Sequence, residues 1–358
     1  MSRPSLGESE EAAVAEVLRS GWLGEGPLTR SFESAVAEFT GAPHVIAVNT
    51  GTAALHLTLL ALGAGPGDEV ILPSFTYASD PMAVTLTGAT PVFADIDPIT
   101  LNLAPAQVNA LLSPRTRVIL PTDYAGLAAD VPGIRRAMEG RDIPILRDAA
   151  HSFGSRIDGR PVGVWCGETA TMFSFDPVKN LTCGEGGAVL VNDDKLAQRL
   201  RQLRSLGFAP SARGKSVTGP GYRCHLSSIH AAIGLAQFSR LPELLAGRQA
   251  IAREYDEQLR DIPGIVTFLR DYGSVVPFLY PVRIVDGRRD ELVRRFQALG
   301  IHADLRYSPC HREPYFQQTS RTGALPETER LAAELLCLPI YTGMTEAEQA
   351  EVVSVLRA

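Results

Sequence analysis

One lysine, Lys179, lies where its amine could take part in covalent chemistry. It follows the run Phe173-Ser-Phe-Asp-Pro-Val178 and precedes the glycine-rich turn Gly184-Glu-Gly-Gly187, after which the chain becomes apolar. A lysine amine with little solvation and a lowered pKa condenses with an aldehyde to form a Schiff base. The alternative is an exposed loop cation, which needs no functional explanation. Loops elsewhere in the chain bear on this choice.

The position of these loops follows from an alternation of strand-like and helix-like segments in the first half of the chain. Short apolar runs suited to strands cover residues 45–48, 69–72, 90–93, 118–120 and 143–146, and a helical pattern covers residues 53–62. Such alternation predicts an α/β fold in which helices cover both faces of a mostly parallel sheet. Ligands bind such sheets at the carboxyl ends of the strands. We therefore expect functional side chains in the loops that follow these strands.

Three of these loops carry residue types that would complement a Schiff-base lysine. Gly51 and Thr52 open a helix directly after a strand, so their N–H groups favour a phosphate. Tyr77 offers an aromatic face in a second loop, and Asp148 leaves a third strand as a carboxylate. Together with Lys179, this set matches the groups that bind pyridoxal phosphate.

Each predicted contact with the cofactor has a physical reason. Lys179 provides the amine for the cofactor aldehyde. A buried carboxylate at Asp148 raises the pKa of the pyridine nitrogen and keeps it protonated. Tyr77 provides a stacking partner for the ring. Donors for the phosphate are expected from Gly51, Thr52 and Ser174.

Composition narrows the class of protein. The 358-residue chain has a net charge of −6 and a pI near 5.7, which argues against a nucleic-acid or anionic-membrane surface because no basic block offsets it. Its five cysteines are scattered without a metal-ligand spacing, as expected for reduced thiols in the cytoplasm. No run approaches the roughly 20 apolar residues of a membrane helix, and residues 1–11 lack a signal-peptide pattern.

Eight motifs extend this interpretation over the whole chain. They are Ser20-Gly-Trp-Leu-Gly-Glu-Gly-Pro27, Asn49-Thr-Gly-Thr-Ala-Ala-Leu-His56, Pro73-Ser-Phe-Thr-Tyr77, Asp148-Ala-Ala-His151, Phe173–Gly187, Ala231-Ala-Ile-Gly234, Arg306-Tyr-Ser-Pro-Cys-His311 and Leu338-Pro-Ile-Tyr341. With these motifs in this order, the chain resembles the DegT/DnrJ/EryC1/StrS aminotransferases over essentially its whole length.

The resemblance implies an aspartate-aminotransferase-like fold, that is, fold type I of the pyridoxal-phosphate enzymes. A mixed, mostly parallel seven-stranded sheet would lie between helices, with a smaller C-terminal α+β domain. We expect a large cofactor-binding domain at residues 1–240 and a small domain at residues 241–358. The resemblance also implies a homodimer whose two active sites lie at the subunit interface.

The same resemblance implies an activity. The amino donor would be L-glutamate and the acceptor a nucleotide-linked keto-sugar, either a 4-keto or a 3-keto hexose. No metal is required. His151 joins the expected cofactor-binding residues, and substrate contacts are expected from Trp22, Arg306, Tyr307 and His311.

Arg223 departs from the family pattern. The family commonly has Gly-Tyr-Asn-Tyr-Arg where this chain has Gly221-Tyr-Arg-Cys-His225, and the Asn reaches the cofactor phosphate of the neighbouring subunit. Arg223 would bind that phosphate, or instead a substrate diphosphate or carboxylate. We read the neighbouring Cys224 as a packing residue.

Two other functions remain open at this point. One is amination of a keto-cyclitol or another non-nucleotide ketone, which the substitution at Arg223 keeps in view. The other is a non-catalytic regulatory homologue, which the intact lysine, aspartate and phosphate loop disfavour.

Overall fold

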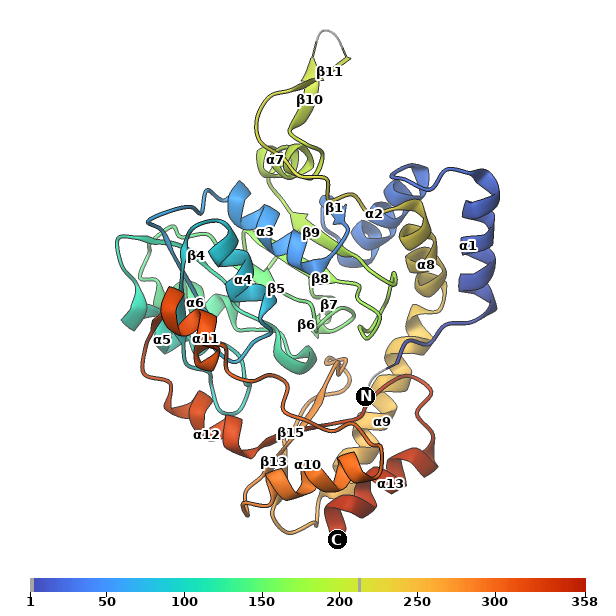
Figure 1. Ribbon diagram of the computed structural model, residues 1–358, viewed down its shortest axis with the longest axis vertical. Helices are drawn as coiled ribbons and strands as arrows, with labels where there is room; N and C mark the ends of the chain where they lie inside the picture. The colour runs from blue at the N-terminus through green and yellow to red at the C-terminus, as the bar shows by residue number, and fades with distance from the viewer. Residues whose placement is uncertain (1–2, 212–213) are drawn as a thin grey trace.

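The computed structural model describes residues 3–211 and 214–358 (Figure 1). Its helices are α1 (Glu8–Ser20), α2 (Pro27–Thr40), α3 (Gly51–Ala61), α4 (Ser79–Leu86), α5 (Pro105–Leu111), α6 (Val131–Ala137), α7 (Asp194–Arg204), α8 (Ser228–Ser239), α9 (Leu241–Leu259), α10 (Arg289–Ala298), α11 (Pro314–Thr319), α12 (Pro326–Glu334) and α13 (Glu346–Arg357). Its strands are β1 (His44–Val48), β2 (Glu69–Pro73), β3 (Thr90–Ala94), β4 (Thr116–Ile119), β5 (Leu146–Asp148), β6 (Arg156–Ile157), β7 (Arg160–Pro161), β8 (Ala170–Ser174), β9 (Gly187–Val191), β10 (Phe208–Ser211), β11 (Gly214–Val217), β12 (Ile265–Thr267), β13 (Tyr280–Ile284), β14 (Arg321–Thr322) and β15 (Leu335–Leu338).

Two four-stranded sheets lie edge to edge, in the orders β14-β3-β2-β4 and β1-β9-β8-β5. Parallel bridges between Ile119 and Ile145 and between Thr122 and Asp148 join β4 to β5. Only β9 runs antiparallel to its neighbours, β1 and β8. The predicted mixed, mostly parallel sheet is therefore confirmed. The strand count differs from the expected seven because β14, from the C-terminal part of the chain, adds to the edge at β3.

Most of the predicted strands and the first predicted helix are present, but β5 begins later than expected. It covers Leu146–Asp148, whereas the apolar run predicted a strand over residues 143–146. Pro144 lies in that run and cannot donate a ladder hydrogen bond. The shift places Asp148 within the strand end.

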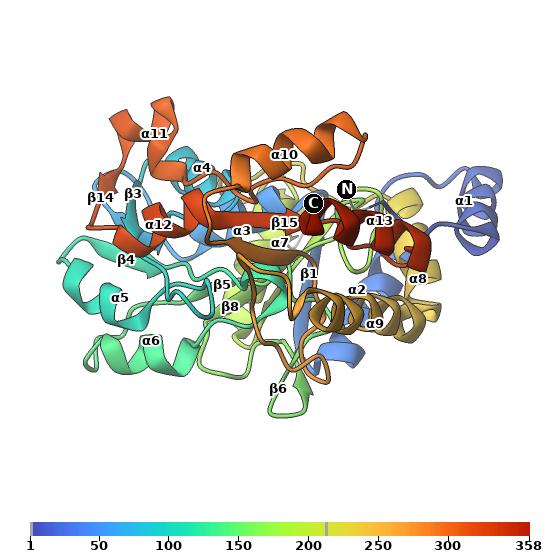
Figure 2. The same cartoon turned by 90° about the horizontal axis from the view of Figure 1, so that it is seen from below.

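Alternating strand residues bury both faces of the sheet. Ile46 and Val48 of β1 pack in the cluster that includes α3, α4 and α7, whereas Val45 and Ala47 pack in the cluster that includes α2. In Figure 2, α5 and α6 lie on one side of the strands and α4 lies on the other. This two-sided burial explains why the central strands read as continuous apolar runs.

The C-terminal part of the chain forms a sheet of its own. Strands β12, β13 and β15 pair antiparallel, and α9, α10 and α13 pack on them in a separate hydrophobic cluster (Figure 1). The sequence pattern predicted a helix near residues 327–336, but α12 ends at Glu334 and Leu335 begins β15. The apolar run from Leu335 to Leu338 is fully buried by pairing with β13, so tertiary pairing overrides the local preference. The division at residue 240 stays a prediction.

A hairpin of β10 and β11 projects away from the body of the molecule (Figure 1). Within residues 3–211 and 214–358, no helix has both the length and the apolar character that a membrane span needs.

Candidate active site

A cavity of about 360 Å³ opens at the carboxyl ends of β2, β5 and β8 and at the N-terminus of α3. Because parallel strands end at the same edge, loops distant in sequence meet there. Nine of the residues expected to contact cofactor or substrate line it. They are Gly51, Thr52, Tyr77, Asp148, His151, Ser174, Lys179, Arg306 and Tyr307.

Lys179 lies on the loop after β8, with its Nζ 4.1 Å from the ring centroid of Phe278. Its pKa is lowered to about 8, because desolvation disfavours the ammonium more than nearby carboxylates, first Asp148 and then Asp176, favour it. The charge of Arg306 lowers the pKa further. A lysine with this pKa supplies the neutral amine that Schiff-base formation requires near neutral pH.

Asp148 ends β5 and is 4% exposed. Its carboxylate accepts a hydrogen bond from the N–H of Ala150 at 2.8 Å. Burial, together with the charge of Asp80, raises the pKa of Asp148 well above its usual value, and Lys179 opposes this shift. Lys179 and Asp148 therefore face one another electrostatically across the cavity.

The phosphate cradle predicted at the start of α3 is present. Thr50 caps the helix by accepting from the N–H of Ala53 at 3.0 Å. Gly51 packs so closely on Ser174 that a Cβ at Gly51 would lie 2.9 Å from the Ser174 Cβ. Only glycine allows this approach, which brings the Ser174 hydroxyl beside the free N–H groups of the helix.

Aromatic side chains form a second wall of the cavity. The Tyr77 ring is 57% exposed and lies 5.1 Å from the ring of Tyr307. His151 stacks on Phe278 at 4.2 Å, and its Nε2 lies 3.3 Å from the Tyr307 hydroxyl. Burial and then the charges of Lys179 and Arg306 lower the pKa of His151 well below its usual value. The ring is therefore neutral at pH 7. Since its Nδ1 accepts from the N–H of Ala125, Nε2 carries the proton.

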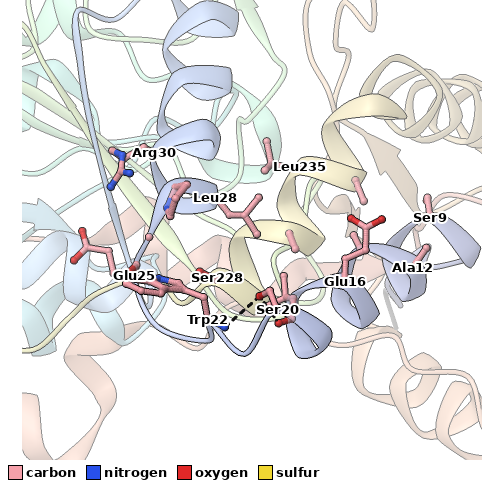
Figure 3. Close-up of a pocket in the computed structure, with 16 residues that line it drawn as sticks. Ser9, Ala12, Glu16, Ser20, Trp22, Glu25, Leu28, Arg30, Ser228 and Leu235 are labelled. Atoms are coloured by element: carbon pink, nitrogen blue, oxygen red, sulfur yellow. Dashed lines mark hydrogen bonds between the residues drawn. The ribbon is translucent and has the colours of Figure 1, made fainter.

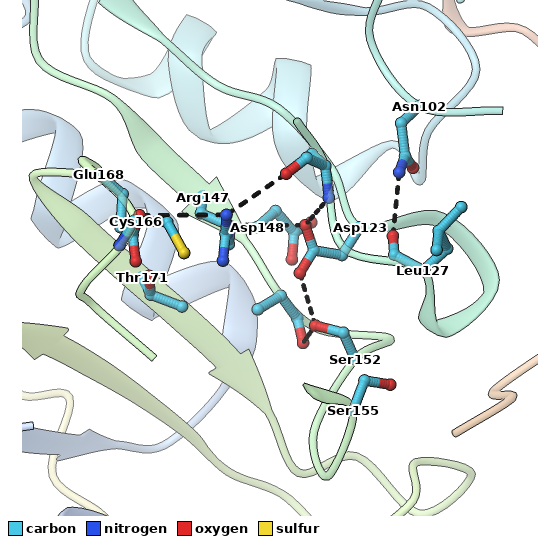
Figure 4. A network of polar contacts seen from close by, with 12 residues as sticks. Asn102, Asp123, Leu127, Arg147, Asp148, Ser152, Ser155, Cys166, Glu168 and Thr171 are labelled. Carbon is cyan, nitrogen blue, oxygen red and sulfur yellow. Dashed lines mark hydrogen bonds and ion pairs between the residues drawn. The ribbon is translucent and has the colours of Figure 1, made fainter. Parts of the chain in front are cut away.

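A buried ionic cluster supports Asp148 from behind (Figure 4). Arg147 is fully buried, 3.8 Å from Asp123 and 4.0 Å from Glu168, and donates to the Ala129 carbonyl at 3.4 Å. Desolvation raises the pKa of Asp123 to about 6 although Arg147 opposes this. Asp123 also accepts from the Ser152 hydroxyl at 2.6 Å. The cluster ties β5 to the loops on either side of the cavity.

Three expected residues lie outside this cavity. Trp22 borders a separate groove of about 1080 Å³ between α1, α2 and α8, where its indole N–H donates to the Glu25 carbonyl at 3.0 Å (Figure 3). Arg223 is exposed and follows the β10–β11 hairpin. Both ring nitrogens of His311 contact protein partners, Ser74 at 2.7 Å and Glu329 at 2.6 Å. The contacts of His311 are those of a structural link between the loop after β2 and α12.

Comparison with known proteins gives a family for this architecture. The family model of the DegT/DnrJ/EryC1/StrS aminotransferases matches residues 4–357. The chain belongs to this family. It is similar to the aminotransferase TlmJ from Streptoalloteichus hindustanus, with 37% identity, a TM-score of 0.93 and coverage of 99% of this chain and 97% of TlmJ.

Two further solved structures in this family are similar to this aminotransferase. DesV from S. venezuelae, solved with a ketimine intermediate, is 36% identical, with a TM-score of 0.89 and coverage of 97% of this chain and 93% of DesV. The sugar aminotransferase CalS13 from Micromonospora echinospora is 31% identical, with a TM-score of 0.91 and coverage of 99% and 98%. The protein is therefore a pyridoxal-phosphate-dependent aminotransferase.

The residues in the cavity fit this cofactor. The aminotransferase presents a partly desolvated amine at Lys179, a buried carboxylate at Asp148, and a helix N-terminus that a Cβ at Gly51 would obstruct. This donor set corresponds to the aldehyde, the ring nitrogen and the phosphate of the cofactor.

Sequence reasoning missed several residues at this site. Phe278 comes from the C-terminal part of the chain and contacts both Lys179 and His151. Asp80 lies buried behind Asp148, held by Thr76 and Thr122. Asp80 immediately precedes Pro81 within α4 and carried no local signal beyond an acidic residue in a helix's first turn.

Proposed function

We propose that this aminotransferase moves the amino group of L-glutamate to a nucleotide-linked keto-sugar. The observation that carries this proposal is Arg306, which lines the same cavity as Lys179. Across residues 3–211 and 214–358, no side chain forms a hydrogen bond or ion pair with its guanidinium. An unpaired guanidinium beside the reactive amine suits the carboxylate of an amino-acid donor or the diphosphate of an acceptor. The likeness to the sugar aminotransferase CalS13 supports a sugar as the acceptor.

Each half-reaction needs the same four tasks from the protein. Bound pyridoxal phosphate supplies the electron sink for charge that develops at the donor Cα. Lys179 binds the cofactor aldehyde and, once released, carries the proton between the donor Cα and the cofactor C4′. Asp148 holds the proton on the ring nitrogen, and the N–H groups at Gly51 and Thr52 hold the phosphate. Arg306 orients the substrate anion.

A homodimer with shared active sites is part of the proposal. Arg223 is exposed and does not line the cavity of its own chain, so its guanidinium is free to reach the cofactor phosphate in a neighbouring subunit.

The visible absorbance spectrum of the protein with pyridoxal phosphate tests the first half-reaction. We expect a Schiff-base band in the wild type that converts to the pyridoxamine form when L-glutamate is added. Lys179→Ala should not form the band normally. Absence of the band in the wild type would overturn the site assignment.

The acceptor is tested with pyridoxamine-loaded protein. Nucleotide-linked 3-keto and 4-keto hexoses are compared with the same sugars without the nucleotide and with a keto-cyclitol. Return of the Schiff-base band only with nucleotide-linked sugars supports the proposal. Equal return with the cyclitol would contradict it. Arg306→Leu should raise KM for the substrate anion by roughly 10- to 100-fold, because a hydrogen bond to a charged group is lost.

A further inference from the structure

Asp80 is a fully buried carboxylate for which the reaction described above has no use. It is 0% exposed, does not line the cavity, and lies in the first turn of α4. Its carboxyl group is hydrogen-bonded to that of Asp148. Two buried carboxyl groups in contact cannot both be ionised without a large electrostatic cost. Burial and this contact raise the pKa of both groups, so the pair holds a proton.

The hydrogen bonds around Asp80 indicate where that proton resides. Its Oδ2 accepts from the Thr76 hydroxyl at 2.6 Å and from the Thr122 hydroxyl at 2.9 Å. Oδ2 therefore has both lone pairs engaged, and Oδ1, with only a long contact of 3.3 Å from Ser79, is left to carry a proton. Asp148 has better partners for a negative charge, since the Ala150 N–H and the Lys179 amine both favour its ionised form.

We propose that Asp80 is a positioning residue for the cofactor's ring nitrogen: as a protonated carboxyl it donates to Asp148 and keeps that side chain a single, oriented negative charge. Thr76 and Thr122 fix the rotamer of Asp80 by accepting no role other than donors to Oδ2. The proposal rests on the assignment of Asp148 to the ring nitrogen and does not depend on the identity of donor or acceptor.

Two substitutions of Asp80 separate its proton from its charge. In Asp80→Asn, the amide oxygen can accept from both threonines and the NH₂ group can donate to Asp148, so the proposed pattern is kept without a negative charge. In Asp80→Ala, the donor is lost and Asp148 is left with an unfilled neighbour. We expect the dissociation constant for pyridoxal phosphate, measured by absorbance titration of the apo-protein, to stay within about threefold of wild type for Asp80→Asn and to rise roughly 10- to 100-fold for Asp80→Ala.

A second measurement uses the apo-protein alone. A carboxyl group whose pKa is raised by folding contributes stability at low pH, and that contribution is lost as pH rises toward the folded pKa. Asp80→Asn removes one such group, so its melting temperature should fall less than that of wild type between pH 5 and pH 8, by about 2–4 °C. The other charged or titratable groups that face the pair are common to both proteins. They are Lys179, Asp176, Arg306, Asp123, Tyr307 and Cys310.

The outcomes decide between distinct explanations. If Asp80→Asn weakens cofactor binding as much as Asp80→Ala, Asp80 acts as an anion and the proposal is wrong. Parallel melting curves for apo wild type and Asp80→Asn would also overturn it, and this comparison remains decisive if Asp80→Ala does not fold. Failure of the wild type to bind pyridoxal phosphate would instead overturn the site assignment, while the apo-protein comparison would still test the carboxyl pair.

Discussion

At the scale of single residues, the protonation of Lys179 depends on groups from several loops. Burial lowers its pKa to about 8, the carboxylates of Asp148, Asp176 and Asp80 raise it, and Arg306 lowers it. The amine attacks an aldehyde only when neutral. Arg306 therefore has two effects: it presents a cation to the substrate and it keeps the lysine reactive.

This dependence predicts how cofactor attachment responds to pH. The rate of Schiff-base formation between apo-protein and pyridoxal phosphate should rise with pH and reach half its maximum near the Lys179 pKa of about 8. Arg306→Leu should move this midpoint to higher pH, because a positive charge that disfavours the ammonium is removed. Stopped-flow absorbance measures the rate, and Arg306→Lys, which keeps the charge, is the control. A midpoint that does not move in Arg306→Leu would contradict the electrostatic explanation.

At the scale of elements, the site depends on how closely α3 approaches β8. Gly51→Ala would place a Cβ 2.9 Å from the Ser174 Cβ and 3.2 Å from the Met172 Cε. We expect this overpacking to destabilise the protein by about 1–3 kcal/mol and to weaken cofactor binding, because the helix N-terminus must move away from Ser174.

Thermal unfolding and absorbance titration measure the two effects of Gly51→Ala. Gly65→Ala is the matched control, since no atom lies within 4 Å of the added Cβ and the backbone at Gly65 is not left-handed. Equal behaviour of the two variants would show that the close approach at Gly51 does not matter.

The strand β5 depends on Arg147. Arg147→Leu would leave Asp123 and Glu168 buried without their cation, and removing one partner of a buried ionic group costs about 3–5 kcal/mol. Without that guanidinium, the pKa of Asp123, already about 6, rises further. A raised pKa stabilises the fold at low pH and this contribution is lost as pH rises. The free energy lost in Arg147→Leu should thus be larger at pH 8 than at pH 5.

Denaturant unfolding of the apo-protein at both pH values measures this difference. Arg135→Leu is a suitable control, because that exposed-side arginine bonds the Gly167 and Ile143 carbonyls and leaves no buried carboxylate unpaired. A loss in Arg147→Leu that is the same at pH 5 and pH 8 would mean that the carboxylates are not responsible.

At the scale of the whole molecule, the proposed homodimer predicts complementation between subunits. If Arg223 acts on the partner's cofactor, a hybrid of one Lys179→Ala chain and one Arg223→Ala chain has one intact site, with Lys179 from one chain and Arg223 from the other. Random mixing yields hybrids as half of the dimers, so activity should return to about a quarter of the wild-type value.

Differently tagged chains, unfolded and refolded together, provide the hybrids, and each variant refolded alone is the control. No recovery in an isolated hybrid would mean that Arg223 acts within its own chain or not at this site. Sedimentation at several concentrations gives the oligomeric state independently.

Much of this site could be predicted from the sequence because its signals are local. Lys179, Asp148 and Gly51 each follow an apolar strand and precede a turn or helix, and parallel strands bring such positions to one edge. The same periodicity predicted the parallel sheet and its helical covering. The sheet brought nine of the twelve expected site residues to one cavity and left Trp22, Arg223 and His311 outside it.

The remaining features depend on contacts between segments distant in sequence, which no local pattern records. Asp80 is a first-turn helix residue by its sequence, and only packing against β5 makes it the partner of Asp148. Phe278 reads as part of an apolar run until the C-terminal part folds back over Lys179. Leu335 leaves the expected helix because β13 offers a buried pairing edge. The sequence by itself therefore determined the cofactor and the chemistry of the lysine, whereas only the tertiary structure decided which buried charges set their protonation, because desolvation and charge proximity exist only in the folded chain.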